Sequence, residues 1–293
     1  MHRHGTNGVY MNRPFTAVLF AAIHLSGVSL ACAQETAQLT RQDQQRVAVT
    51  AYAPKAESCR GVAIVSPGAG GSEAGYRYLG EALSALSYLA VVVGHRESGR
   101  DALREHTRHS GLREGLAELI TEPDAYRGRF MDITAAKNWA QGRCKGSEAI
   151  LIGHSMGAAT AMMEAGARNK LGIQGGNTFS AYIALSPQGP GSIFPDNAWS
   201  GIRKPVLLMT GTRDAELGGA SWQTRTEPFT NLPPGCKWLG VIDGASHMNF
   251  AGNGLSRKTE ALTARTVGAF LDGVNTGECR PMQHTPSMDL KTK

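Results

Sequence analysis

The 293-residue chain has few charged and few aromatic residues, and their placement excludes several classes of protein. Asp, Glu, Lys and Arg make up 18% of the chain, below the roughly 25% of a typical soluble domain. The basic residues are scattered among acidic ones, without the basic stripe and interleaved aromatic side chains of a nucleic-acid-binding surface. The sequence also lacks a repeated unit, a C-x-x-C pair and paired histidines with metal-ligand spacing. We therefore expect no nucleic acid, no metal and no cofactor, and no obligate protein partner is evident.

A run of apolar residues long enough to cross a membrane is lacking too, and the N-terminal apolar run is typical of a signal peptide. The run Phe15–Leu30 follows Arg13 and precedes Ala31-Cys32-Ala33, whose small residues suit a cleavage site. Because the run is short and poorly flanked for a spanning helix, we predict cleavage near Ala33, no stable membrane insertion, and a secreted or periplasmic protein. The alternative is a lipoprotein anchor on Cys32, although Ser29 stands where a branched apolar residue is preferred.

Cysteine is scarce, with five in the whole chain, and four of them remain after cleavage. These are Cys59, Cys144, Cys236 and Cys279. An even number of cysteines in an exported protein predicts two disulfide bonds. The sequence alone allows three pairings and does not choose among them.

Seven short apolar segments, several of them nearly continuous, have the pattern of strands buried on both faces. They are residues 47–52, 62–66, 89–93, 149–152, 181–186, 206–210 and 239–242. Stretches with helical spacing of apolar residues lie between them. This alternation predicts an α/β fold with an open, mostly parallel sheet and helices on both faces. We expect one domain over residues 47–280, after a signal peptide (1–33) and a flexible lead-in (34–46), and before a polar C-terminal tail (281–293).

Two segments depart from this alternation. Residues 99–128 are charged, with leucines at helical intervals, and residues 187–203 are rich in Pro, Gly and Ser. We expect Phe194 and Trp199 of the second segment to be exposed. Either segment could overhang a site, but neither is long enough to form a large cap domain.

The strongest motif lies where the apolar strand 149–152 ends. It runs directly into Gly153-His154-Ser155-Met156-Gly157, a G-x-S-x-G motif, and small helix-forming residues follow. A strand–turn–helix context is typical of a nucleophile elbow, in which the two glycines leave room for a strained turn. We therefore predict that Ser155 is a catalytic nucleophile at the N-terminus of a helix.

A serine hydroxyl needs a base to take its proton and a carboxylate to orient that base. In proteins with such an elbow the acid and then the histidine follow the serine along the chain. Of the two later histidines, His247 follows a predicted strand and His284 lies in the polar tail, so we predict that His247 is the base. Asp214 also follows a predicted strand and is the predicted acid, ahead of Asp243 and Asp196.

Attack by the serine creates a negative charge on the substrate oxygen, which two backbone N–H groups stabilise. Met156, directly after the nucleophile, is the first predicted donor. The second comes from the loop after an earlier strand, and the glycine-rich turn 66–72 suits this role. We predict that Ala69 is this donor, with Gly70 as the alternative.

Three residues are predicted to contact the substrate. They are Gly70 in the glycine-rich turn, His154 inside the elbow and Trp222 after the acid. A packing role is the alternative for His154 and for Trp222.

Four motifs resemble those of the α/β-hydrolase superfamily over nearly all of residues 47–272. They are S-P-G-A-G-G-S at 66–72, G-H-S-M-G at 153–157, G-T-R-D at 211–214 and G-A-S-H-M-N-F at 244–250. Their combination is similar to dienelactone-hydrolase-like, platelet-activating-factor-acetylhydrolase-like and cutinase-like serine esterases. The resemblance implies a twisted eight-stranded sheet and hydrolysis of small carboxylic esters through Ser155, Asp214 and His247. The sequence departs from the pattern in the serine nucleophile, which replaces the cysteine of true dienelactone hydrolases, and in Ala69, where polyester-cleaving relatives tend to have an aromatic residue.

The strand order of that superfamily also bears on the cysteines. It places the strand after Cys59 beside the strand after Cys144, and so implies the pairs Cys59–Cys144 and Cys236–Cys279. Two alternatives to an esterase remain, namely a serine peptidase or amidase with the same three residues and a non-catalytic binding protein on the same scaffold.

Overall fold

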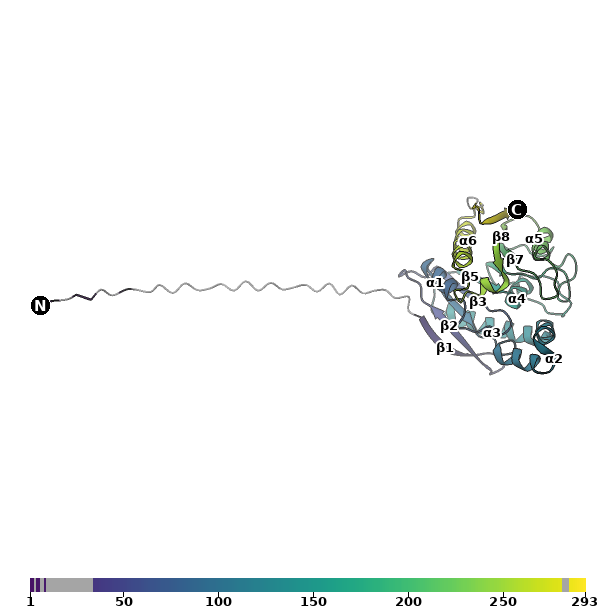
Figure 1. Ribbon diagram of the computed structural model, residues 1–293, viewed down its shortest axis with the longest axis horizontal. Coiled ribbons are helices and arrows are strands. Elements are labelled where there is room, and N and C mark those ends of the chain that lie inside the picture. The colour runs from purple at the N-terminus through teal and green to yellow at the C-terminus, as the bar shows by residue number, and fades with distance from the viewer. Residues whose placement is uncertain (3, 6–7, 9–33, 281–284) are drawn as a thin grey trace. The chain divides into compact units, whose positions relative to one another are not determined.

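The computed structural model describes residues 1, 2, 4, 5, 8, 34–280 and 285–293 (Figure 1). Residues 1–31 form a unit apart from residues 32–293, and only the second unit is described below. The predicted apolar run and cleavage site of the signal peptide lie outside the described residues, as does His284.

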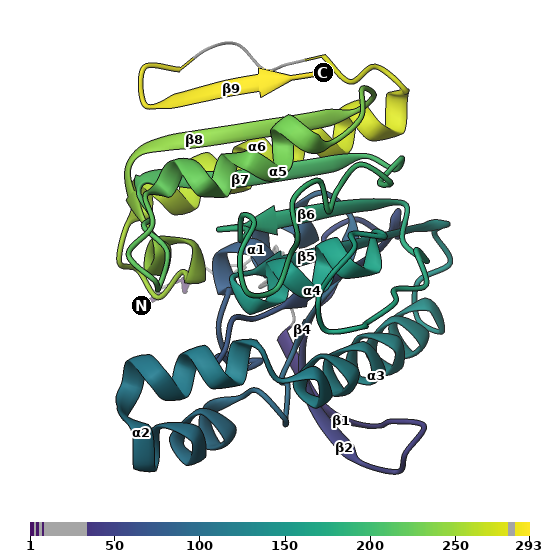
Figure 2. The same cartoon turned by 90° about the vertical axis from the view of Figure 1, so that its right-hand side faces the viewer.

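The strands of the described chain form one sheet in the order β1-β2-β4-β3-β5-β6-β7-β8-β9. Their bounds are β1 (Gln34–Thr40), β2 (Arg46–Tyr52), β3 (Gly61–Ser66), β4 (Tyr88–Val93), β5 (Glu148–His154), β6 (Ala181–Leu185), β7 (Val206–Arg213), β8 (Lys237–Ser246) and β9 (Met288–Thr292). The six strands from β4 to β8 are parallel, whereas β1, β2 and β9 pair antiparallel with their neighbours. Figure 2 shows this order from β9 at the top to β1 and β2 at the bottom.

Helices cover both faces of the sheet. Their bounds are α1 (Arg77–Ala85), α2 (Arg100–Ile120), α3 (Pro123–Gln141), α4 (Met156–Glu164), α5 (Glu227–Asn231) and α6 (Arg257–Thr276), with 3₁₀ helices η1 (Trp222–Thr226) and η2 (His247–Ala251). Side chains of α1 and α6 pack in one hydrophobic core, and those of α3 and α4 pack in the other. The predicted fold class, a mostly parallel sheet between helices, is therefore confirmed.

All seven predicted strands are present, because each inner strand is buried on both faces. Every residue of β3 and of β4 is buried, so the unbroken apolar runs of the sequence correspond to strands with a helix layer on each side.

The two edges of the sheet correct the sequence-based boundaries. Residues 34–40, predicted as part of a flexible lead-in, form β1 and pair with β2 along its whole length. Residues 288–292, predicted as part of a polar tail, form β9, and the sheet has nine strands instead of eight. Both edge strands bury only a few side chains, notably Leu39 and Met288, so their apolar pattern is weak.

Helix α2 consists of two arms that meet at Gly111. This residue has φ 81° and ψ 171°, a conformation that favours glycine and that breaks the helix. Gly115 of the second arm lies against the backbone of His106 in the first, so close that a β-carbon would collide with it. The arms therefore fold back on one another, as the lower left of Figure 2 shows.

The segment 187–203 is packed more closely than the sequence predicted. Phe194 and Trp199, expected to be exposed, are buried, with their ring centroids 5.3 Å apart. Ile193, Ala198 and Ile202 join them in the core, since the segment folds back onto the face that carries α4. Its Pro, Gly and Ser residues thus shape a fixed loop with its own hydrophobic contacts.

Both disulfide bonds implied by the resemblance are present. Cys59 is bonded to Cys144 and Cys236 to Cys279. The first bond joins the segments that lead into the parallel neighbours β3 and β5. A bond of this kind stabilises a fold by about 2–4 kcal/mol. Among the helices of the described part of the chain, none is long and apolar enough to cross a membrane.

Candidate active site

The site lies where the strand order reverses. From β3 the chain passes to β4 on one side, and then returns to β5 on the other side of β3. Ser66, the last residue of β3, is therefore in register with Gly153 near the end of β5. Loops that leave the carboxyl ends of two such strands border a crevice, the usual ligand site of an open α/β sheet.

The turn between β5 and α4 holds Ser155 in a strained conformation. Its φ is 54° and its ψ is −120°, in a region that non-glycine residues rarely adopt. A β-carbon at Gly153 would collide with the backbone of Gly157, and one at Gly157 would collide with the carbonyl of Ser66. Only glycine fits at either position, so the motif forces the turn that projects Ser155 from the sheet.

Three side chains predicted from the sequence lie in hydrogen-bonding contact. Nε2 of His247 is 2.9 Å from Oγ of Ser155, and Nδ1 of His247 is 2.8 Å from Oδ1 of Asp214. Asp214 follows a bulge at the end of β7, and His247 begins η2 directly after β8. A capping box between Ser246 and Asn249 fixes the start of η2 and thereby the position of the imidazole.

Asp214 is fully buried, and polar groups surround its carboxylate. The hydroxyl of Thr210 donates to Oδ2 at 2.9 Å, and Nε of Arg225 lies 3.0 Å from Oδ1. Arg225 also donates to the backbone oxygens of Asp214 and Ser186, so its guanidinium fixes the acid loop against the end of β6. A buried charge is tolerated when it is paired and hydrogen-bonded in this way. No sequence motif pointed to Arg225.

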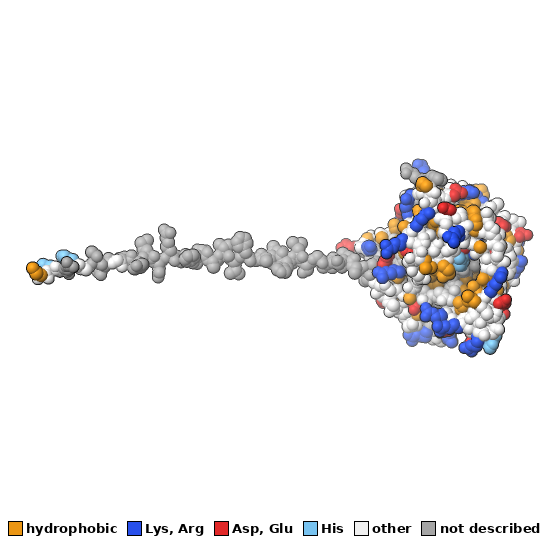
Figure 3. Space-filling view, viewed as in Figure 1, with side chains coloured by type: hydrophobic (Ala, Val, Ile, Leu, Met, Phe, Trp, Pro, Cys, Tyr) orange, Lys and Arg blue, Asp and Glu red, His pale blue; other side chains and the backbone are white. Residues whose placement is uncertain are grey.

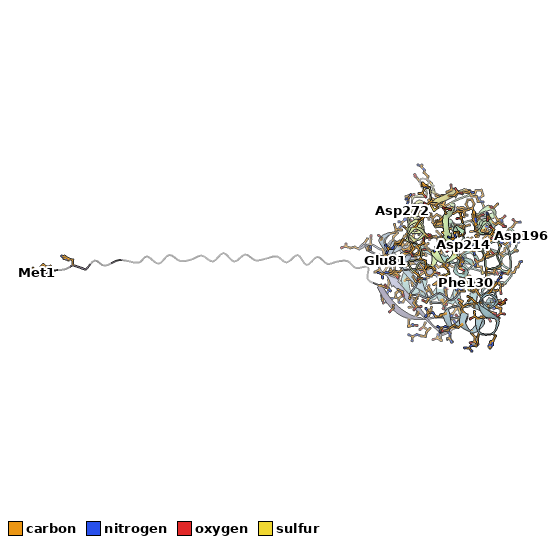
Figure 4. The ribbon with its side chains drawn as sticks, viewed as in Figure 1. Met1, Glu81, Phe130, Asp196, Asp214 and Asp272 are labelled. Atoms are coloured by element: carbon orange, nitrogen blue, oxygen red, sulfur yellow. A yellow bond between two sulfur atoms is a disulfide. The ribbon has the colours of Figure 1, made fainter. Side chains whose placement is uncertain are left out.

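The other two acids considered from the sequence are exposed and lie elsewhere. Asp243 accepts a hydrogen bond from Thr212 at the surface. Asp196 belongs to the segment 187–203 and is labelled, with Asp214, in Figure 4.

The glycine-rich turn after β3 leaves the N–H group of Ala69 without an acceptor. The N–H of Gly68 donates to the hydroxyl of Tyr76 at 3.1 Å, and that of Gly70 donates to the carbonyl of Ser98 at 2.8 Å. In the described part of the chain no acceptor binds the N–H of Ala69 or that of Met156. Gly70, the alternative oxyanion donor, is therefore occupied, whereas both predicted donors are free.

A cleft of about 800 Å³ opens beside Ser155 and His247. Its walls come from the second arm of α2, the loop 188–193 and the loop 215–218, so both segments predicted to overhang a site border it. Apolar side chains, including Leu116, Ile120 and Leu217, supply much of the lining. On the face drawn in Figure 3, Lys and Arg side chains lie in separate groups with hydrophobic side chains between them.

The three predicted substrate contacts are not among the residues that line this cleft. Trp222 borders a different hollow, between β7, β8 and β9. His154 is buried beneath the triad, where it bonds to Tyr76 and to the backbone of His247. Gly70 lies against Leu103 of α2 and not at the cleft. The structure thus agrees with the packing alternative for His154, whereas contact of Trp222 and Gly70 with the substrate stays a prediction.

A second Ser–His–Asp set, which the sequence analysis missed, lies under the glycine-rich turn. Oγ of Ser66 is 2.8 Å from Nε2 of His95, and Nδ1 of His95 is 3.0 Å from Oδ2 of Asp132. The three side chains are 3% exposed or less. Oγ of Ser66 also accepts a hydrogen bond from Arg129, and Asp132 is paired with Arg41. We refer to these five residues as the buried network.

Burial governs ionisation in this network. It lowers the pKa of His95 well below its ordinary value, and the positive charge of Arg129 acts in the same direction. Burial also raises the pKa of Asp132 to about 6, against the opposing effect of Arg41. His95 is therefore neutral near pH 7, and Asp132 is ionised.

Comparison with known proteins agrees with this geometry. No protein-family model matches the chain. Cutinase est2 of Thermobifida alba is 24% identical over 223 residues, which are 75% of this chain and 60% of that cutinase. Cutinase 1 of Thermobifida cellulosilytica is 25% identical over 200 residues, 68% of this chain and 64% of that cutinase. The chain thus spans less than two thirds of the length of these curated relatives.

Solved structures with the same fold cover most of both chains. The dienelactone hydrolase of Anabaena variabilis has a TM-score of 0.53 at 16% identity, over 82% of this chain and 97% of that one. An α/β serine hydrolase homologue of Coxiella burnetii has a TM-score of 0.54 at 18% identity, over 79% of this chain and 96% of that one. The sheet order and the elbow thus define an α/β-hydrolase fold. The chain is similar to the cutinases at 24–25% identity, and it shares its fold with the two solved hydrolase structures.

Proposed function

We propose that the protein hydrolyses carboxylic esters through an acyl-enzyme on Ser155, with His247 as base and acid and Asp214 as the orienting carboxylate. The observation that carries this proposal is the 2.9 Å contact between Oγ of Ser155 and Nε2 of His247 at the side of an open cleft. A serine with a strained backbone, a base in contact and room for a substrate is the arrangement that acyl transfer requires.

The reaction follows from these contacts in two halves. Oγ of Ser155 attacks the ester carbon while Nε2 of His247 takes the hydroxyl proton, and the N–H groups of Ala69 and Met156 receive the oxyanion. The tetrahedral intermediate collapses, the bond to the alcohol oxygen breaks, and His247 returns the proton to that alcohol. Water then attacks the acyl-enzyme by the same route, which releases the acid and restores Ser155. Asp214 accepts the Nδ1–H of His247 throughout and so holds Nε2 toward the serine.

The apolar cleft supports an uncharged ester with a hydrophobic portion as substrate. Its volume of about 800 Å³ lies within the 300–1,000 Å³ typical of sites for small molecules. The name of the cutinases that the chain resembles favours an ester over an amide. The two disulfide bonds support export to an oxidising compartment, as the predicted signal peptide requires.

Active-site labelling tests the proposal. A fluorophosphonate probe should modify the folded protein on Ser155, and the Ser155→Ala variant should remain unlabelled. The Ser66→Ala variant is the matched control, because it also removes a serine hydroxyl bonded to histidine but should still be labelled. Wild-type protein that resists the probe, or a label on Ser66, would contradict the proposal.

Turnover assays separate the ester from the amide reaction. We expect hydrolysis of p-nitrophenyl esters and much slower cleavage of the corresponding anilides and of peptides. Peptide or anilide cleavage at a comparable kcat/KM would establish the peptidase alternative in place of the esterase.

A further inference from the structure

Tyr76 and His154 lie behind the triad, and the reaction as proposed uses neither side chain. Both are buried, and Tyr76 precedes α1 with a positive φ of 58°. The hydroxyl oxygen of Tyr76 accepts the N–H of Gly68 at 3.1 Å and lies 2.7 Å from Nδ1 of His154. Nε2 of His154 lies 3.1 Å from the carbonyl oxygen of His247. These four residues connect the glycine-rich turn to the catalytic histidine.

The hydrogen atoms of this connection have one consistent order. A carbonyl oxygen can only accept, so the hydrogen on His154 must be on Nε2, facing His247. Burial lowers the pKa of His154 well below its ordinary value, and the nearby His247 acts in the same direction, so the ring carries no second proton. Nδ1 of His154 therefore accepts from the hydroxyl of Tyr76, whose oxygen remains free to accept from Gly68. Every polar atom in the connection has a partner.

The connection joins two parts of the site whose separation must stay fixed, namely the turn that holds Ala69 and the catalytic histidine. Gly68 is bonded directly to Ala69, the proposed oxyanion donor, and a β-carbon at Gly68 would lie 3.2 Å from the β-carbon of Ser155. At the other end, the ring centroids of His154 and His247 are 4.9 Å apart. On either side of this point Arg129 donates to the carbonyl of Pro67 and the N–H of Gly70 donates to the carbonyl of Ser98, while the hydroxyl of Tyr76 binds the N–H of Gly68 between them.

We propose that Tyr76 and His154 are a pair of positioning residues that set the oxyanion donor of Ala69 relative to His247. The inference rests on the esterase function proposed above. An oxyanion forms only in the transition state, so misplacement of its donor lowers kcat and leaves substrate binding nearly unchanged. The connection thus contributes to the rate through geometry, without contact with substrate.

The test compares two tyrosine-to-phenylalanine variants. Tyr76→Phe keeps the ring and removes the hydroxyl between Gly68 and His154. Tyr182→Phe is the matched control, because its buried hydroxyl also joins a backbone N–H, at Phe179, to a side chain, that of Asn177, but lies near the far end of α4 at Glu164. We expect Tyr76→Phe to lower kcat about 10- to 100-fold with KM changed less than about threefold, since small misplacements of reacting groups have effects of this size. Tyr182→Phe should leave both constants unchanged.

A transition-state analogue supplies the readout that a purely structural role would not change. The inhibition constant of a trifluoromethyl ketone, which forms an oxyanion on Ser155, should rise in Tyr76→Phe by the same factor by which kcat falls. Wild-type kcat in Tyr76→Phe, or equal losses in Tyr182→Phe, would overturn the inference while wild-type turnover still supported the esterase. Absence of turnover in the wild type would instead remove the proposed function.

A second variant keeps the inference testable if Tyr76→Phe does not fold. His154→Gln retains an N–H donor for the carbonyl of His247 but no longer places an acceptor at the position of Nδ1 that faces Tyr76, whereas His154→Phe has neither group. We expect kcat to decrease in the order wild type, His154→Gln, His154→Phe. Where both single variants fold, the Tyr76→Phe/His154→Gln double variant should lose no more than the worse single variant, because both changes break one connection. Multiplicative losses, or equal kcat for the two His154 variants, would contradict the pairing.

Discussion

Two Ser–His–Asp sets lie close together in this molecule, and the Ser–His and His–Asp distances are nearly the same in both sets. In the set of Ser155 the two contacts are 2.9 and 2.8 Å, and in the set of Ser66 they are 2.8 and 3.0 Å. The surroundings differ. The His247 side chain is 30% exposed at a cleft, whereas His95 is buried. Ser155 has a positive φ and precedes a helix with free N–H groups, whereas Ser66 ends a strand in the core.

This difference shows that contact distances alone do not make a catalytic site. A nucleophile also needs access for the substrate and unoccupied donors for the oxyanion. The hydroxyl of Ser66 instead faces Arg129, which also donates to the carbonyl of Pro67 at 2.7 Å. The buried network thus fixes the glycine-rich turn, and the set of Ser155 beside the cleft carries the chemistry that we propose.

The largest expected effect separates the two serines by activity. Ser155→Ala should lower kcat by about 10⁴-fold or more, since loss of a nucleophile has effects of this order in serine hydrolases. The free energy of unfolding should change by less than about 0.5 kcal/mol, because the hydroxyl of Ser155 contacts His247, whose side chain is 30% exposed, rather than a fully buried group. Ester turnover and urea denaturation of the purified variant check both expectations. A residual kcat within tenfold of the wild type would contradict the assignment.

In contrast to Ser155→Ala, a substitution in the buried network should cause a large loss of stability. Asp132→Asn removes the charge that faces Arg41, and breaking a buried pair costs about 3 kcal/mol. Asp124→Asn is the control, because its pair with Arg127 is exposed and should contribute less than about 1 kcal/mol. The excess stability of the wild type over Asp132→Asn should grow as the pH falls below 6, because the folded protein then binds a proton on Asp132 that the unfolded chain binds only at lower pH. A difference that is constant from pH 5 to pH 8 would be inconsistent with this account.

Ser66→Ala sharpens the comparison further. The variant leaves Nε2 of His95 without its hydroxyl partner, which should lower the free energy of unfolding by about 1–3 kcal/mol. We expect kcat to fall only a few-fold, because Arg129 still holds the carbonyl of Pro67. Thermal unfolding and ester turnover measure the two effects. A loss of activity in Ser66→Ala comparable to that of Ser155→Ala would contradict the assignment of the nucleophile to the set of Ser155.

The smallest expected effect is a loss of stability on acidification. His95 and His154 are buried with lowered pKa values, so below pH 6.5 the unfolded chain binds protons that the folded protein does not. Stability due to these histidines is therefore lost as the pH falls through 6.5. Asp132, whose pKa is raised to about 6, acts in the opposite direction and offsets part of the loss.

We expect the free energy of unfolding to decrease by about 1 kcal/mol between pH 7 and pH 6. Urea denaturation across this range measures the slope, and His95→Gln should reduce it. A stability that rises toward pH 6 would show that these rings ionise in the folded protein.

Much of the fold could be predicted from the sequence, because burial of the inner strands dictates continuous apolar runs. The segments 62–66 and 89–93 correspond to β3 and β4 within one residue. The edge strands β1 and β9 were missed because each has one solvated side and few apolar residues. Trp199 was misplaced because a loop rich in Pro and Gly can still bury an aromatic ring when it folds onto a helix layer.

The residues of the candidate site also fall into those that the sequence predicted and those that it did not. Ser155, Asp214 and His247 could be predicted because each directly follows a strand in a short motif, and the structure brings them together. Tyr76 and Arg225 could not, because their contacts join distant segments with no characteristic spacing. His154 was expected at the substrate because it adjoins Ser155, but the turn directs neighbouring side chains to opposite sides.

The antiparallel strand β9 covers the edge of β8, whose far end leads into His247. Lys293 at the close of β9 exchanges backbone hydrogen bonds with Lys237 at the start of β8. A chain shortened before residue 285 would leave unpaired the N–H and C=O groups of β8 that pair with β9 from Trp238 to Ile242. Such a chain should self-associate through that open edge even though every residue of the triad is retained, so the last residues protect solubility.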